Sequence, residues 1–212
     1  MIPKLHYISQ GKTAKLILEN VQKACTSGAE LVQLDLNNVS NAQLVSVAQE
    51  ARDITSHFQT RLVIKEHYKI AKEVKADGVH LEQAHTCPSI VRAHVYTWQI
   101  IGGTANTLKE SKTLLEKQVD YILLSPFRLG TTTKKVPTVL GLDGYTVLTE
   151  ALQTETPIIG FGSIDTADIK DILATGISGV AVSDAITNNF DSIKDFHKLL
   201  NASATEEMRH TF

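Results

Sequence analysis

The feature that most constrains this sequence is a regular alternation of short apolar runs with amphipathic segments. Each run has three to five residues and is rich in β-branched side chains, the pattern of a strand buried on both faces. Eight such runs follow one another along the chain. We expect strands at residues 5–9, 30–34, 62–64, 78–81, 98–101, 121–124, 157–160 and 178–182.

The segments between these runs have apolar residues at helical spacing. The first of them has Ile17, Leu18 and Val21 on one face and stops at Gly28, a residue suited to the position after a helix. Asp165 is a candidate N-cap for a later helix. We expect helices at residues 12–27, 40–54, 68–74, 86–94, 107–115, 142–152, 165–174 and 191–200.

Eight strands alternating with helices predict a parallel sheet closed into a single-domain (β/α)8 TIM barrel. An open doubly wound sheet is the alternative, but it would show a Gly-rich turn after the first strand, and residues 9–12 (SQGK) do not form one. The 212 residues suit one barrel without an internal boundary. We expect the polar tail, residues 201–212, to be frayed.

Charge and composition exclude several classes of protein. The net charge is −2, without a basic run, which argues against a nucleic-acid or membrane-surface partner. No window approaches the ~18 apolar residues of a membrane-spanning helix. Cys25 and Cys87 lack metal-ligand spacing and are expected to be reduced. We therefore expect a cytoplasmic protein, either a monomer or a homo-oligomer.

The loop after the sixth strand is unusual in composition. Residues 125–126 (SP) end the strand, and residues 130–135 (GTTTKK) then offer backbone N–H groups, hydroxyls and cationic side chains, all suited to an anion. Gly130 could let the segment 127–137 close over a ligand. A solvated surface loop is the alternative.

The carboxyl ends of barrel strands meet at one face, where such barrels keep their sites. After strands seven and eight, Gly162, Val182 and Ser183 match a phosphate cradle, although the glycine could simply relieve a tight turn. His80 lies within a strand run, which favours a hydrogen-bonded barrel residue over a catalyst. His67 fits either a helix-entry residue or a site residue.

Several motifs together resemble the thiamine phosphate synthase family. They are VQL at 32–34, ADGVHL at 76–81 with Gln83, DYI at 120–122, TTTK at 131–134, IGFG at 159–162 and VAVS at 180–183. The resemblance implies a barrel that joins hydroxymethylpyrimidine diphosphate to thiazole phosphate and releases diphosphate with the help of Mg²⁺. A related branch contains thiazole tautomerases.

The resemblance also assigns roles to individual residues. Gln33 matches a glutamine that binds the pyrimidine, and Lys134 a lysine that binds diphosphate. Thr131 and Thr133 match hydroxyls on the thiazole phosphate, and Thr104 takes the place of a serine. Gly162, Val182 and Ser183 fall at the phosphate cradle. The catalytic candidates are Lys134, Lys65 and Thr104.

The departures from the family pattern follow strands two to four. Asp35 and Asn37 stand where the family has Arg and Lys, so two cations for diphosphate are missing, and Lys65 could replace part of that charge. Glu66 and His85 fall at the two metal-binding aspartates. Mg²⁺ prefers oxygen ligands, so a mixed site of Asp35, Glu66 and His85 for Mn²⁺ or Zn²⁺ is the alternative.

Three hypotheses remain open at this point. The first is a thiamine phosphate synthase that takes small phosphorylated heterocyclic substrates and uses Mg²⁺ or Mn²⁺. The second is a non-catalytic barrel that binds a thiazole or thiamine phosphate. The third is a thiazole tautomerase, which would need a histidine after the sixth strand to move a ring proton, where this chain has Ser125 and Pro126.

Overall fold

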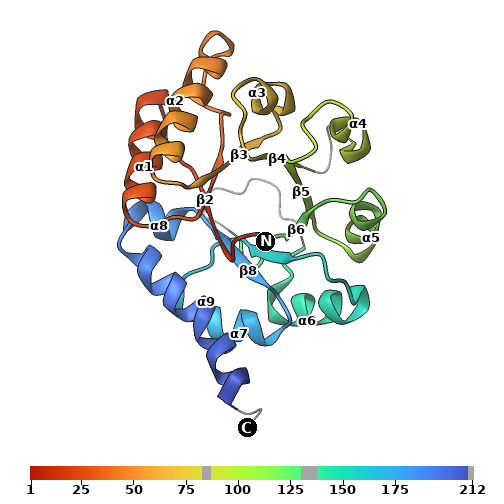
Figure 1. The fold of residues 1–212 in the computed structure, drawn as a ribbon. Coiled ribbons are helices and arrows are strands. Elements are labelled where there is room, and N and C mark those ends of the chain that lie inside the picture. The colour runs from red at the N-terminus through yellow and green to blue at the C-terminus, as the bar shows by residue number, and fades with distance from the viewer. Residues whose placement is uncertain (83–86, 130–137, 210–212) are drawn as a thin grey trace.

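A computed structural model describes residues 1–82, 87–129 and 138–209, with side chains described as far as residue 202. Its strands are all parallel and close into a barrel in chain order, which confirms the predicted fold (Figure 1). β1 completes the barrel by pairing with β8. The strands are β1 (Leu5–Ile8), β2 (Leu31–Leu34), β3 (Arg61–Lys65), β4 (Gly78–Leu81), β5 (Ile100–Ala105), β6 (Tyr121–Leu124), β7 (Ile158–Phe161) and β8 (Gly179–Val182).

The helices form a ring around the barrel (Figure 1). Two short 3-10 turns, Asn41–Gln43 and Thr166–Asp168, precede α2 and α7. The side chain of Asp165 caps the second turn, as predicted. The helices are α1 (Ala14–Thr26), α2 (Leu44–His57), α3 (Tyr68–Glu73), α4 (Pro88–Arg92), α5 (Leu108–Glu116), α6 (Gly141–Leu152), α7 (Ile169–Ala174), α8 (Asp184–Asn188) and α9 (Ser192–Arg209).

The structure differs from the predicted elements at three places. The short helix α8 was not expected, and α9 continues to Arg209 instead of ending near residue 200. β5 includes Gly102 and Thr104, which the sequence placed after the strand. Position 102 requires a glycine because a Cβ there would lie 2.1 Å from Cζ of Tyr121. Its role is to make room inside the barrel and not to form a turn.

Alternating side chains divide the core into two layers. Inside the barrel, Ile8, Tyr121, Leu123, Ile159 and Ala181 pack together. The larger layer lies between the sheet and the helices and includes most of the other buried apolar residues. Side chains directed inward at the strand ends therefore reach the mouth of the barrel.

Two aspartates that precede strands fix the amino-terminal ends of their neighbours. Oδ2 of Asp77 accepts hydrogen bonds from Nη1 of Arg52 at 2.6 Å and from the backbone N–H of Leu62 at 2.8 Å. The same arrangement recurs with Asp120, Arg92 and the N–H of Ile101. The aspartates of the ADGVHL and DYI motifs are thus structural, and they lie at the end of the barrel opposite the expected site.

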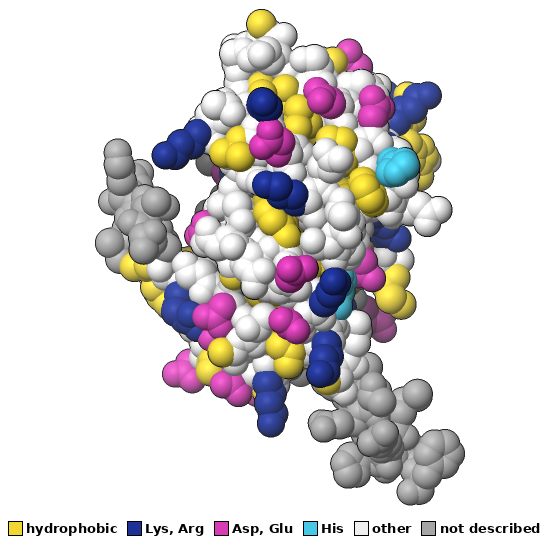
Figure 2. All heavy atoms as spheres, turned by 90° about the vertical axis from the view of Figure 1, so that its left-hand side faces the viewer, with side chains coloured by type: hydrophobic (Ala, Val, Ile, Leu, Met, Phe, Trp, Pro, Cys, Tyr) yellow, Lys and Arg dark blue, Asp and Glu magenta, His cyan; other side chains and the backbone are white. Residues whose placement is uncertain are grey.

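The outer surface is of mixed charge. Figure 2 shows basic and acidic side chains interspersed over the face that it displays, with apolar side chains scattered among them. In the parts of the chain that the structure describes, no helix is both long enough and apolar enough to cross a membrane.

Candidate active site

A cavity of about 180 Å³ opens at the carboxyl ends of the strands. Apolar side chains of Ile8, Leu123 and Phe161 form part of its wall. The polar side chains that line it come from strands far apart in the sequence. They belong to Ser9, Gln10, Gln33, Asp35, Lys65, His80, Glu82, Thr104 and Ser183.

Gln33 lines this cavity and has an unpaired acceptor atom. It lies on β2 with only 3% of its surface exposed. Its Oε1 atom has no hydrogen-bond partner among the described residues. Buried carbonyl oxygens are normally paired, so this atom is available to a ligand that donates a hydrogen bond. The predicted substrate-binding role of Gln33 fits this geometry.

A chain of hydrogen bonds runs from the barrel interior to the cavity. Nδ1 of His80 lies 3.0 Å from the Tyr121 hydroxyl, and Nε2 lies 2.8 Å from Oγ1 of Thr104. Burial lowers the pKa of His80 to about 3, with smaller contributions from His6 and Lys65, so its ring is neutral. His80 is the hydrogen-bonded barrel residue that its strand position indicated, and Thr104 faces the site.

Lys65 lies at the centre of an ion network. Its Nζ is 3.0 Å from Oδ2 of Asp35 and 2.7 Å from Oε1 of Glu82. Burial alone would lower the pKa of Lys65, but the hydrogen bond to Glu82 and the charges of both carboxylates outweigh it and raise the pKa. The ammonium stays protonated, with two carboxylates against one cation. Glu82 had no motif to single it out in the sequence.

Glu66, a predicted metal ligand, lies directly after β3 and is hydrogen-bonded to the residue that follows β4. Its backbone has φ +62°, and its Oε1 accepts a hydrogen bond from the N–H of Glu82. Among the described residues, no three His, Cys, Asp or Glu side chains form a group that could hold a metal. The donors present are carboxylate oxygens, which fits a Mg²⁺ ion bound by one or two carboxylates and completed by substrate oxygens.

Two backbone hydrogen bonds join the loop after β6 to the end of β7. The N–H of Phe127 donates to the carbonyl of Phe161 at 2.7 Å, and the N–H of Arg128 donates to the carbonyl of Gly162 at 3.0 Å. Gly162 has φ +123°, and a Cβ there would lie 2.7 Å from the Phe127 nitrogen. The glycine is therefore required for close backbone contact between the two loops.

The remaining predicted residues occupy different positions. Ser183 lines the cavity immediately before α8. The side chain of Val182 is buried in the layer between the sheet and the helices, so only its backbone can serve a ligand. Arg128, in the loop after β6, is not a free cation, because it pairs with Asp168 and donates to the Ser163 carbonyl at 3.1 Å.

Several predicted site residues lie outside the described part of the chain, and their roles stay predictions. They are Thr131, Thr133, Lys134 and Lys135 in the loop after β6, and His85 after β4.

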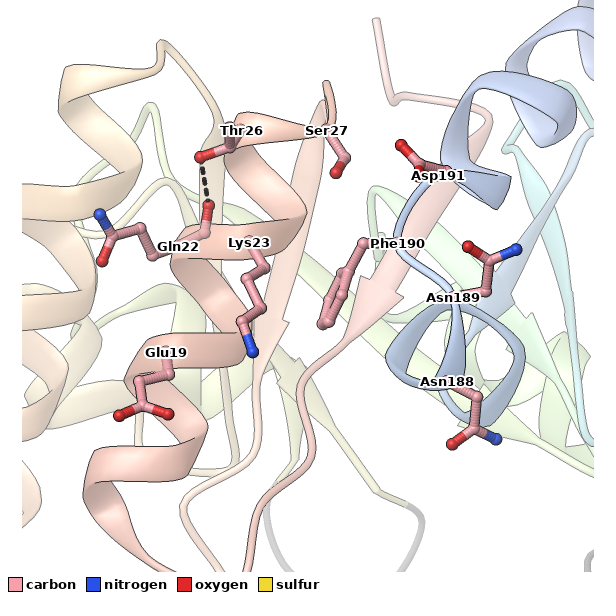
Figure 3. Close-up of a pocket in the computed structure, with 9 residues that line it drawn as sticks. All are labelled: Glu19, Gln22, Lys23, Thr26, Ser27, Asn188, Asn189, Phe190 and Asp191. Atoms are coloured by element: carbon pink, nitrogen blue, oxygen red, sulfur yellow. Dashed lines mark hydrogen bonds between the residues drawn. The ribbon is translucent and has the colours of Figure 1, made fainter.

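A larger hollow of about 630 Å³ lies on the outer surface, between α1 and the turn from α8 to α9 (Figure 3). Nζ of Lys23 lies 6.0 Å from the centre of the Phe190 ring there. The other labelled side chains are polar, and the charged ones among them, Glu19 and Asp191, are acidic. No strand residue lines this hollow, so the smaller cavity is the candidate active site.

Comparison with known proteins decides the family. The profile described as thiamine monophosphate synthase matches residues 5–186. The chain belongs to the thiamine monophosphate synthase family. The thiamine-phosphate synthase of Flavobacterium psychrophilum is 34% identical over 206 residues, which cover 94% of this chain and 100% of that relative. The thiamine-phosphate synthase of Bacteroides fragilis is 30% identical over 200 residues, with 93% and 98% covered.

A solved structure agrees in fold. Thiamine phosphate pyrophosphorylase from Pyrococcus furiosus superimposes with a TM-score of 0.82 at 23% identity, covering 94% of this chain and 96% of that one. The family membership confirms the prediction of a transferase in thiamine biosynthesis.

Proposed function

We propose that this member of the family joins hydroxymethylpyrimidine diphosphate to thiazole phosphate and releases diphosphate. The observation that carries the proposal is the unpaired, buried Oε1 of Gln33, which lies in one cavity with Thr104. An aminopyrimidine brings N–H donors to such an oxygen. The apolar wall from Leu123 and Phe161 suits the faces of a flat ring.

The described residues hold the ring better than they hold the diphosphate. Lys65 carries a positive charge at the cavity, but this charge is already paired with Asp35 and Glu82. The charge of the diphosphate therefore requires further cations, for which Lys134 in the loop after β6 is the candidate. A bound divalent cation, either Mg²⁺ on the Glu66 carboxylate or Mn²⁺ on Glu66 and His85, would stabilise the charge that develops on the leaving diphosphate.

The proposed reaction breaks one bond and forms another. The bond between the methylene carbon of the pyrimidine and the diphosphate oxygen breaks, and its electron pair stays on that oxygen. The lone pair of the thiazole nitrogen then forms the new C–N bond. Gln33 orients the pyrimidine, and Ser183 and Gly162 hold the thiazole phosphate.

The direct test is to incubate the purified protein with both substrates and Mg²⁺ or Mn²⁺. We expect thiamine phosphate and diphosphate in equal amounts, and neither product when one substrate is omitted. A Gln33→Leu variant should raise KM for the pyrimidine substrate and leave KM for thiazole phosphate unchanged. Absence of thiamine phosphate above background with both metals would refute the proposal.

The pairing of the Lys65 ammonium with two carboxylates favours a second function. If the loop and metal do not supply enough charge for the leaving group, the barrel would bind thiazole phosphate or thiamine phosphate without turnover. Calorimetric titration with each compound separates the two functions. Binding without product formation supports the second, and no heat from either compound refutes it.

A further inference from the structure

We propose that His80 and Tyr121 are positioning residues that orient the Thr104 hydroxyl so that it donates its hydrogen bond to the leaving oxygen of the diphosphate. The inference rests on the proposed function, because it names the substrate atom that Thr104 contacts. The two buried residues would thus determine the direction of one hydrogen bond in the active site.

The two hydrogen bonds of His80 have a defined order. A neutral imidazole donates from one nitrogen and accepts at the other, so its contacts with Tyr121 and Thr104 must run in the same direction. Either the phenol donates and Thr104 accepts, or Thr104 donates and the phenol accepts. The surroundings of Tyr121 decide between these two arrangements.

Tyr121 is fully buried, and burial raises the pKa of its hydroxyl far above the usual range, so the phenol keeps its proton. It packs against apolar Ile8, Leu123 and Ile159 inside the barrel. The ring of His6 contacts it edge-on at 5.1 Å, but neither nitrogen of His6 bonds the phenol: Nε2 bonds the carbonyl of Pro3, and Nδ1 has no partner among the described residues.

In the described part of the chain, Nδ1 of His80 is therefore the acceptor that the structure offers to the Tyr121 proton. The phenol donates to Nδ1, which leaves the ring proton on Nε2. That proton is donated to Oγ1 of Thr104 at 2.8 Å. The hydroxyl of Thr104 has accepted one hydrogen bond, and its own proton is available to a ligand in the cavity.

The direction of these hydrogen bonds matters for the C–O bond that breaks in the proposed reaction. As the C–O bond opens, negative charge collects on the diphosphate oxygen, and a hydroxyl that donates to it stabilises the transition state. The reverse arrangement would present a lone pair of Thr104 to that charge. No proton is transferred, because the hydroxyl only strengthens its hydrogen bond to the leaving oxygen.

The test is a double-mutant cycle on kcat with Tyr121→Phe, Thr104→Val and the double variant. Removing one donor to a developing anion lowers kcat by about 100-fold, the effect we expect for Thr104→Val. Tyr121→Phe leaves His80 free to take either proton position, and we expect a loss of about tenfold, the equivalent of about 1.4 kcal/mol. The double variant should be no slower than Thr104→Val alone. KM should change little in all three.

Tyr7→Phe is the matched control, because it also deletes a buried phenol hydroxyl, one that bonds Oγ1 of Thr187 at 2.9 Å, and neither Tyr7 nor Thr187 lines the cavity. It should lower Tm without lowering kcat. The inference would be overturned if the kcat losses of Tyr121→Phe and Thr104→Val multiplied in the double variant. A Tyr121→Phe enzyme with the kcat of wild type would overturn it as well.

His80→Gln gives a second readout. Its amide can donate to Thr104 whatever Tyr121 does, so Tyr121→Phe should have no effect on kcat in that background, and a persisting tenfold loss would contradict the relay. The cycle with Tyr121 and Thr104 does not depend on this variant folding. Wild-type protein without synthase activity refutes the proposed function itself, whereas an active wild type with a non-coupled cycle refutes only this inference.

Discussion

Gly162→Ala tests whether the β6 and β7 loops depend on close backbone contact. The new Cβ would lie 2.7 Å from the Phe127 nitrogen and 3.0 Å from both the Arg128 oxygen and Cα of Pro126. All three are backbone atoms, so the loop itself must move. The backbone at φ +123° costs a non-glycine residue about 1–3 kcal/mol. Stretching the two hydrogen bonds between the loops adds about 1 kcal/mol each.

Gly28→Ala separates these contributions. Gly28 also has a left-handed backbone, with φ +96°, but nothing lies within 4 Å of its Cβ position. Both variants lose stability from the strained backbone, and only Gly162→Ala loses further stability from the crowding. We expect Gly162→Ala to be less stable than Gly28→Ala by about 2 kcal/mol, or about 4–8 °C in Tm for a domain of this size.

Urea unfolding and thermal scans of the two variants measure this difference. Gly162→Ala should also raise KM for thiazole phosphate, because the displaced loop belongs to the proposed phosphate cradle, and Gly28→Ala should not. Equal stability of the two variants would show that the loops accommodate the methyl group, and the reasoning from close contact would be wrong.

Three further predictions follow from buried or paired groups. Asp77→Ala should lower stability by about 1–3 kcal/mol, because it leaves the Leu62 N–H and Arg52 without their acceptor, and unchanged KM values would confirm that the ADGVHL aspartate is structural. The hydrogen bond from Lys117 lowers the pKa of Cys87 to about 7, so alkylation of this thiol should rise with a midpoint near pH 7, and Lys117→Met should move that midpoint to higher pH. Burial lowers the pKa of His6 to about 4 and of His80 to about 3, so the folded protein binds fewer protons than the unfolded chain below pH 6.5. Stability should fall as the pH drops from 6.5 towards 4, by up to about 1.4 kcal/mol per pH unit for each histidine, and urea midpoints that stay constant over this range would contradict it.

The fold could be predicted from sequence because a strand buried on both faces leaves a short apolar run, and the number and order of these runs allow few topologies. The exceptions have physical causes. Residues 102–104 resemble a turn, yet they belong to β5, and position 102 is a glycine because the ring of Tyr121 occupies the space that a Cβ would take. Nothing local in the sequence records a contact with the neighbouring strand. Likewise, α8 has only five residues and too few apolar positions to show a helical period.

The sequence placed single residues at the cavity, as it did for Gln33, Thr104 and Ser183, but it could not show a property that belongs to a pair of residues. Asp35 and Lys65 each depart from the family pattern, and taken separately they are a lost cation and a gained one. In the structure they are 3.0 Å apart and form one ion pair, which also holds Glu82. The two departures are therefore coupled: without Lys65, two carboxylates would face each other in the cavity, and without Asp35, Lys65 would be freer to meet a diphosphate. On this reasoning Asp35→Asn should strengthen binding of the diphosphate substrate, and a calorimetric affinity equal to or weaker than that of wild type would show that the pair does not restrain Lys65.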